Sequence, residues 1–222
     1  MEEEYYNLGW FGRHPGIYDL SGIIISPLRK MAARKMGKEK LKIIDVGTGT
    51  GAHAYEMAKL GHDVTGIDLD KKMLAKAEHK VSSNMELKFL HADGTKIPFA
   101  DNSFDAASIS FAMHDVPFEI GIKLLREVSR VIKDDGFVFI IDFNTPINNI
   151  GARILYWIAQ LYESPNYKPF ALKGLATYLD TAGLEQMTKS SFMGAIQFTR
   201  LERIKQPIIA SAERAIPEKS YK

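Results

Sequence analysis

Between residues 41 and 143 the sequence alternates short apolar runs with segments of helical periodicity. The apolar runs at 41–46, 63–68, 86–90, 104–111 and 136–143 are predicted strands, and the segments at 52–60, 71–81 and 119–132 are predicted helices. Apolar strands that alternate with helices are typical of a parallel sheet covered on both faces. The sequence therefore predicts an α/β fold.

The segments on either side of this region have a different character. Residues 1–40 show amphipathic helical periodicity, and we expect Pro27 to divide that helix in two because proline removes a helical hydrogen bond. A further helix is predicted at 172–182, followed by strands at 185–190 and 195–204 that should form an antiparallel hairpin. A length of 222 residues fits one domain, with a helical cap at 1–40, a core at 41–145 and late helices and hairpin at 146–222.

Composition excludes several kinds of site. The chain has no Cys, which excludes a disulfide scaffold, thiolate-bound zinc or iron, and a Cys nucleophile. No spacing of His, Asp and Glu indicates a metal site, and a net charge of +2 is too small to indicate a nucleic-acid partner. Neither a secretory signal nor a membrane-spanning run is recognisable, so we expect a cytoplasmic protein.

Seven basic residues lie between positions 29 and 42. They are Arg29, Lys30, Arg34, Lys35, Lys38, Lys40 and Lys42. A solvated helix face is the favoured interpretation, and peripheral docking on an anionic lipid surface is the alternative.

A glycine-rich loop follows the first predicted strand, with Gly47, Gly49 and Gly51 alternating with two threonines. Glycines permit a tight turn and let a ligand approach the backbone at the start of a helix. Asp68 ends the next strand, where an acid can accept hydrogen bonds from both hydroxyls of a ribose. The loop alone leaves open a nicotinamide or flavin cofactor, or a turn without a ligand.

Two further acidic residues narrow the choice of cofactor. Asp45 precedes the glycines, where a dinucleotide site usually has an apolar residue, and Asp93 follows the third strand. Together with the segment at 97–105 these features resemble the class I S-adenosylmethionine (SAM)-dependent methyltransferases, above all those of ubiquinone and menaquinone biosynthesis. The resemblance extends from about Tyr18 to Lys205. It implies a Rossmann-like fold with a mostly parallel seven-stranded sheet, a C-terminal antiparallel hairpin and an N-terminal helical cap.

The resemblance also implies the cofactor and the residues that bind it. In the family the glycine loop holds the amino-acid end of SAM, and the product is S-adenosylhomocysteine (SAH). Asp68 matches the acid that binds the ribose, and Asp93 matches the group that reads the adenine amino group. The cofactor-binding residues so implied are Tyr18, Asp45, Gly47, Thr48, Gly49, Thr50, Gly51, Asp68, Leu69, Met73, Asp93, Gly94 and Ser110. Each acid could instead cap a helix or brace a turn, which is the favoured role of Asp70.

His114 is the candidate catalytic base. It follows the fourth strand, at the carboxyl end of the sheet where open α/β folds bind their ligands. A base is needed only if the acceptor must lose a proton, as a phenol, enol or thiol does. A histidine that packs or faces the cofactor is the alternative, and contact with the adjacent Asp115 is not assumed.

The methyl acceptor is expected to be a small apolar or aromatic molecule, with a quinol or phenol favoured. Residues 147–164 include Tyr156, Trp157 and Tyr162, and such elements line the acceptor pocket in the family, although plain helix packing is the alternative. The sequence after the fourth strand lacks the signature of enzymes that methylate nucleic-acid amino groups. The open alternatives are methylation of a phospholipid or another small molecule at N, O or S, an NAD(P)-dependent oxidoreductase, and a non-catalytic partner subunit.

Overall fold

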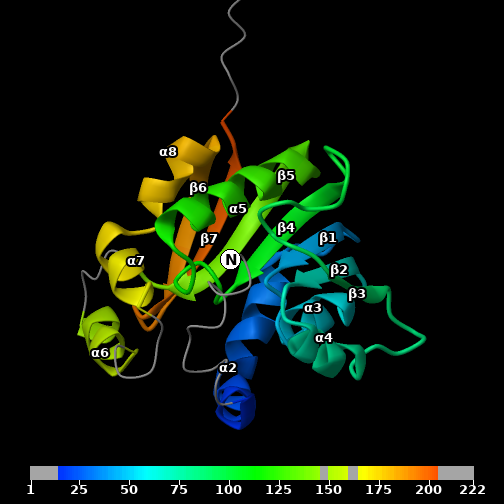
Figure 1. The fold of residues 1–222 in the computed structure, drawn as a ribbon, viewed down its shortest axis with the longest axis horizontal. Coiled ribbons are helices and arrows are strands. Elements are labelled where there is room, and N and C mark those ends of the chain that lie inside the picture. The colour runs from blue at the N-terminus through cyan, green and yellow to red at the C-terminus, as the bar shows by residue number, and fades with distance from the viewer. Residues whose placement is uncertain (1–14, 146–149, 160–164, 205–222) are drawn as a thin grey trace, which may run out of the picture.

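The computed structural model describes residues 15–145, 150–159 and 165–204, with side chains for all of these except residues 15–24, 152 and 155. Seven strands form one sheet in the order β3-β2-β1-β4-β5-β7-β6 (Figure 1). They are β1 (Lys42–Val46), β2 (Asp63–Asp68), β3 (Leu87–His91), β4 (Phe104–Ser110), β5 (Ile132–Phe143), β6 (Leu184–Phe192) and β7 (Ile196–Arg203). The pairs formed among β1 to β5 are parallel, whereas β7 is antiparallel to both β5 and β6. This confirms the predicted sheet and its C-terminal hairpin.

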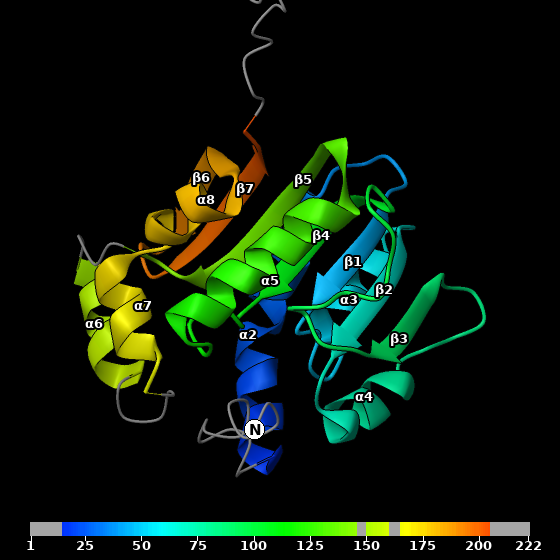
Figure 2. The same ribbon diagram turned by 45° about the horizontal axis from the view of Figure 1, so that its top comes forward.

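Helices cover the sheet and extend beyond its end. They are α2 (Pro15–Lys35), α3 (Ala52–Ala58), α4 (Lys71–Glu78), α5 (Phe118–Val131), α6 (Ile150–Ala159), α7 (Tyr167–Lys173) and α8 (Ala176–Ala182). α2 packs against α3, and α5 packs against α8 (Figure 2). In the described ranges no helix is both long and apolar enough to cross a membrane.

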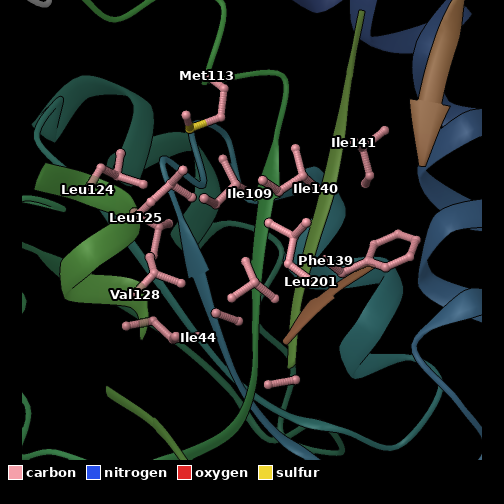
Figure 3. Close-up of a cluster of buried hydrophobic side chains, with 14 of the residues drawn as sticks. Ile44, Ile109, Met113, Leu124, Leu125, Val128, Phe139, Ile140, Ile141 and Leu201 are labelled. Atoms are coloured by element: carbon pink, nitrogen blue, oxygen red, sulfur yellow. The ribbon is translucent and has the colours of Figure 1, made fainter. Parts of the chain in front are cut away.

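One part of the core lies between α5 and the central strands. Figure 3 shows the α5 side chains Leu124, Leu125 and Val128 directed at apolar residues of the sheet, among them Ile44 and Ile109. The spacing of these three leaves one apolar stripe on α5, which the sheet buries. Each such side chain stabilises the fold by roughly 1.5–3 kcal/mol through burial. The packing fixes the carboxyl ends of β1 and β4 beside one another.

Two expectations about helices are wrong. α2 continues through Pro27 instead of dividing there. Pro27 is exposed, and the burial of Ala32 and Ala33 further along supports the helix despite the hydrogen bond that the proline removes. The single helix predicted at 172–182 is two helices, because Gly174 adopts a φ of 80° and the N–H of Leu175 donates to Thr145 Oγ1 at 3.0 Å.

Candidate functional site

The loop between β1 and α3 adopts a conformation that requires its glycines. Gly47, Gly49 and Gly51 have φ values of 68°, 55° and 71°, in the left-handed region that other residues rarely adopt. A Cβ at Gly51 would lie 2.4 Å from the ring of Phe89, and a Cβ at Gly47 would lie 3.1 Å from Ala112. The loop is therefore confined between β3 and the segment that follows β4.

Most N–H groups of this loop are already bonded within the protein. The N–H of Thr48 donates to the carbonyl of Ile67 at 3.0 Å, and that of Gly51 donates to the Thr48 carbonyl at 2.9 Å. The N–H of Gly49 donates to Asp68 Oδ2 at 2.7 Å. These bonds hold the loop against the end of β2, and they leave few backbone donors for an anionic ligand.

Asp45 lies under the loop with an unusual environment for a carboxylate. Its Oδ2 accepts the hydroxyl of Thr48 at 2.7 Å, whereas its Oδ1 is buried without a hydrogen-bond partner among the described residues. Burial raises the pKa of Asp45 to about 6, although Thr48, the nearby Ser108 hydroxyl and the charge of Arg29 lower it. An incompletely bonded buried carboxylate is costly unless a ligand or a proton satisfies it. Thr50 is buried beside it in the loop.

The two acids at the end of β2 have different roles. Asp68 accepts the N–H of Gly49 with one oxygen and the N–H of Asp70 with the other, at 2.7 Å and 2.8 Å. Burial raises the pKa of Asp68 above its ordinary value. Asp70 caps α4 by accepting the N–H groups of Lys72 and Met73, as the sequence predicts. Leu69 follows Asp68 directly, at the carboxyl end of β2.

The remaining predicted cofactor residues lie along the same edge. Asp93 braces a turn by accepting both the N–H and the hydroxyl of Thr95 at 2.8 Å. Gly94 follows it, where a Cβ would lie 2.8 Å from Val46. Met73 is half-buried on α4, and the half-exposed residue Ser110 ends β4 with a hydroxyl that has no partner among the described residues.

The structure therefore gathers the predicted residues at the ends of four neighbouring strands. Tyr18 lies in α2, but its side chain is outside the described residues, as is Tyr162. The described residues contain no group of three or more His, Asp or Glu side chains that could hold a metal ion.

His114 is buried at this edge and forms a pair that the sequence does not reveal. Its Nδ1 lies 2.7 Å from Oδ1 of Asp142, which is fully buried on β5. Asp142 also accepts the N–H groups of Met113, His114 and Phe143. A carboxylate can only accept, so Nδ1 carries the proton and Nε2 is the basic nitrogen. Asp115, the neighbour in sequence, lies 3.9 Å from Nε2.

Aromatic rings lie around His114. Phe143 and Tyr167 meet His114 edge to face, with ring centroids 4.7 Å and 6.0 Å from it. Tyr156 of α6 stacks on Tyr167 at 5.8 Å, and Trp157 beyond it is exposed. The neighbours of His114 thus include several aromatic rings.

Sequence reasoning missed two charged residues of the site. Asp142 lies inside a nearly continuous apolar strand, and only the three-dimensional pairing of β5 with β4 brings it to His114. Arg29 was assigned to a solvated basic face, whereas it is only 7% exposed. The other six residues of that basic run are exposed, as predicted.

Known proteins resemble this chain in sequence. Residues 44–140 match the family described as the methyltransferase domain. A protein of Corynebacterium kroppenstedtii named demethylmenaquinone methyltransferase is 33% identical over 136 residues, which are 59% of this chain and 56% of that protein. A protein of the same name from Bacillus velezensis is 29% identical over 188 residues, 74% of this chain and 79% of that protein. Several of the curated relatives are thus matched over only about half of their length.

Among solved structures, a SAM-dependent methyltransferase from Aquifex aeolicus shares the fold. Its TM-score is 0.61 at 22% identity, and the match covers 78% of this chain and 88% of that one. The comparisons confirm the resemblance that the sequence motifs indicate, and the likeness to the solved structure shows the fold that the resemblance implies.

Proposed function

We propose that this chain is a class I SAM-dependent methyltransferase that transfers a methyl group to a small apolar or aromatic acceptor, and its domain match and its fold support this proposal. A quinol or phenol is the favoured acceptor, because the relatives named above act on a menaquinone precursor by name and aromatic rings surround His114.

The single observation that carries the proposal is the strand order. A dinucleotide-binding fold has the order 3-2-1-4-5-6 with parallel strands throughout. Here β7, which is antiparallel to β5, lies between β5 and β6. This half of the sheet therefore differs from the second nucleotide-binding half of a dinucleotide-binding fold. This disfavours the nicotinamide-dependent alternative that the glycine loop alone leaves open.

The residues at the carboxyl edge fit the cofactor. The left-handed glycines bring backbone close to a ligand, the orphaned oxygen of Asp45 can accept from an ammonium, and Asp68 can accept from ribose hydroxyls. Leu69, Met73, Asp93 and Gly94 would border the adenine, and Ser110 would lie beside the ligand. When bound, SAM supplies a methyl group already activated by its sulfonium.

The chain's own contribution is positioning and proton removal. Asp142 fixes the imidazole of His114 through Nδ1, so that Nε2 is the nitrogen that accepts a proton from the acceptor. The aromatic rings around His114 favour an apolar acceptor, and they exclude water from the basic nitrogen. Orientation of donor and acceptor accounts for the rest of the expected acceleration.

Calorimetric titration with SAM, SAH and NADH is the first test. We expect roughly micromolar binding of SAM and SAH and no binding of NADH. Binding of NADH alone would reject the methyltransferase assignment. Release of SAH with quinols, phenols and thiols then identifies the acceptor class.

The role of His114 is tested by His114→Gln. Turnover should fall by roughly 10²- to 10⁴-fold, which is the range for loss of a general base, while SAM affinity stays unchanged. His79→Gln, at an exposed position on the far end of α4, is the matched control. Full activity of the His114 variant would remove this residue from the mechanism.

A further inference from the structure

The outer face of α6 is apolar and exposed. Four large apolar side chains of this helix are between 49% and 78% exposed, namely Ile150, Ile154, Trp157 and Ile158. Positions spaced in this way lie on one side of a helix. Single apolar side chains are common on protein surfaces, but a contiguous apolar patch marks a surface that binds something. These four residues form the α6 apolar face.

The opposite side of α6 attaches the helix to the domain. Ala159 is buried and Tyr156 is half-buried, and both lie roughly half a turn around the helix from the α6 apolar face. The ring centroid of Tyr156 lies 5.8 Å from that of Tyr167, which lies 4.7 Å from that of Phe143 on β5. The domain therefore packs on one side of α6 and leaves the apolar face toward the outside.

Basic side chains accompany the α6 apolar face. Arg153 is exposed on α6 itself. α7 lies beside α6 at one end of the molecule in both views, and it exposes Lys168 and, one turn later, Leu172 (Figures 1 and 2). Residues 150–173 contain three basic side chains and one acidic side chain. A surface that combines apolar and basic groups is complementary to an anionic lipid bilayer, whose phosphates attract the cations while its acyl region receives the apolar side chains.

A second copy of the chain fits this face less well. α6 has ten residues, so it is about 15 Å long and about 10 Å wide, and one face presents on the order of 150 Å². A stable protein interface buries about 800 Å² on each partner. A two-fold pair would also bring the same basic side chains of both copies together, where they repel one another. Area and charge therefore both favour a lipid surface.

We propose that the α6 apolar face docks on the surface of an anionic lipid bilayer, with the axis of α6 parallel to that surface. Trp157 would lie between the headgroups and the acyl chains, where tryptophan is enriched, and Arg153 and Lys168 would contact lipid phosphates. The docking does not depend on methyl transfer. Because Tyr156 joins α6 to the rings beside His114, docking would also bring those rings near an apolar molecule dissolved in the bilayer.

The fluorescence of Trp157 tests the docking without any change in α6. The chain has two tryptophans, so Trp10→Phe leaves Trp157 as the only one. Its emission should shift to shorter wavelength when vesicles of phosphatidylglycerol and phosphatidylcholine are added, and lipids with brominated acyl chains should quench it. Vesicles of phosphatidylcholine alone should give a much smaller shift, and high salt should weaken the binding because it screens the basic side chains. Unchanged emission with the anionic vesicles would overturn the inference.

Sedimentation with the same anionic vesicles identifies the face that docks. Ile154→Asp should weaken binding by roughly 10- to 100-fold, because it places a charge within the apolar face. Leu60→Asp is the matched control: it changes a 46% exposed apolar residue just after α3 and should leave binding unchanged. Arg153→Gln should weaken binding about fivefold, which is the effect of one basic side chain near an anionic surface. Arg34→Gln, in the basic run at 29–42, should have no effect.

Two results of these measurements would contradict the docking by α6. Equal losses in Ile154→Asp and Leu60→Asp, or a loss only in Arg34→Gln, would mean that another surface contacts the lipid. Light scattering that shows dimers of the wild type and monomers of Ile154→Asp would mean that a second copy covers the α6 apolar face. If Ile154→Asp does not fold, the emission of Trp157 decides between docking and its absence. Failure of SAM to bind would reject the proposed function and leave the docking unaffected.

Discussion

Three acids at the carboxyl edge of the sheet have different roles because their partners differ. Asp45 keeps one oxygen without a partner in the described residues, Asp68 holds the backbone of the glycine loop, and Asp142 orients His114. The order of strands brings them to one edge, yet the local contacts decide which of them is available to a ligand.

Asp68→Ala should weaken SAH binding by roughly 1–3 kcal/mol, because it removes the acceptor for the ribose hydroxyls and loosens Gly49. Asp70→Ala is the matched control. It removes only the cap of α4, so it should cost about 1 kcal/mol of stability and leave SAH affinity intact. Calorimetry and urea unfolding of both variants measure these effects. Equal loss of affinity in the two would mean that Asp68 acts only through local structure.

His53 should make the chain sensitive to acid. Burial lowers the pKa of His53 to about 3 from 6.5, so the folded state binds fewer protons than the unfolded state between these values. The stability that follows from this is fully present above about pH 6.5 and is lost as the pH falls toward 3. We expect His53→Gln to reduce this fall by a few kcal/mol in order of magnitude.

Urea unfolding of the wild type and of His53→Gln between pH 7 and pH 4 is the measurement. His79→Gln, at an exposed position, is the control. The raised pKa of Asp45 acts in the opposite direction below about pH 6, but it is common to all three proteins and cancels in the comparison. Parallel pH profiles for the wild type and the His53 variant would contradict the assignment.

At the level of helices and strands, prediction from sequence succeeded where periodicity is strong. The apolar runs that become β1, β2 and β4, and the stripe on α5, follow directly from burial. Prediction failed where tertiary contacts decide: Thr145 divides α7 from α8 by binding Leu175, and β5 begins early because Ile132 pairs with Phe104. Asp142 was missed for the same reason, since its partner His114 is distant in sequence.

The helix α2 contains a removable source of instability. Pro27 lies in its interior, lacks an N–H donor and is exposed, so alanine there would restore a hydrogen bond without loss of packing. Pro27→Ala should raise the free energy of unfolding by about 1–3 kcal/mol. Lys30→Ala, at an exposed position one turn away, should change it by less than about 0.5 kcal/mol. Lower stability of Pro27→Ala would show that Pro27 is needed to set the direction of the α2 axis.

At the scale of the whole molecule, Arg203 links the last strand, β7, to the junction of α5 and β5. From β7 it donates to the carbonyls of Ser129 and Ile132 and to the side chains of Asp134 and Asn102. These partners lie where α5 meets β5 and in the turn before β4. One side chain therefore joins the C-terminal hairpin to the cofactor half of the domain.

Arg203→Met should lower the free energy of unfolding by roughly 2–4 kcal/mol, since it removes the donor from several part-buried carbonyls. Arg200→Met on the same strand is the control, because among the described residues the Arg200 side chain bonds to the nearby Glu202 and stacks on Phe137. Its effect should be about 1 kcal/mol or less. Urea unfolding at neutral pH distinguishes the two, and equal losses would show that Arg203 has no special role.

The insertion of β7 between β5 and β6 also constrains synthesis on the ribosome. A nascent chain that has emerged only as far as Phe143 contains the five parallel strands, but β5 is then an open edge. An unpaired, apolar edge strand is a template for aggregation. Until β7 leaves the exit tunnel, the edge of β5 therefore stays open to pairing with a strand of another copy.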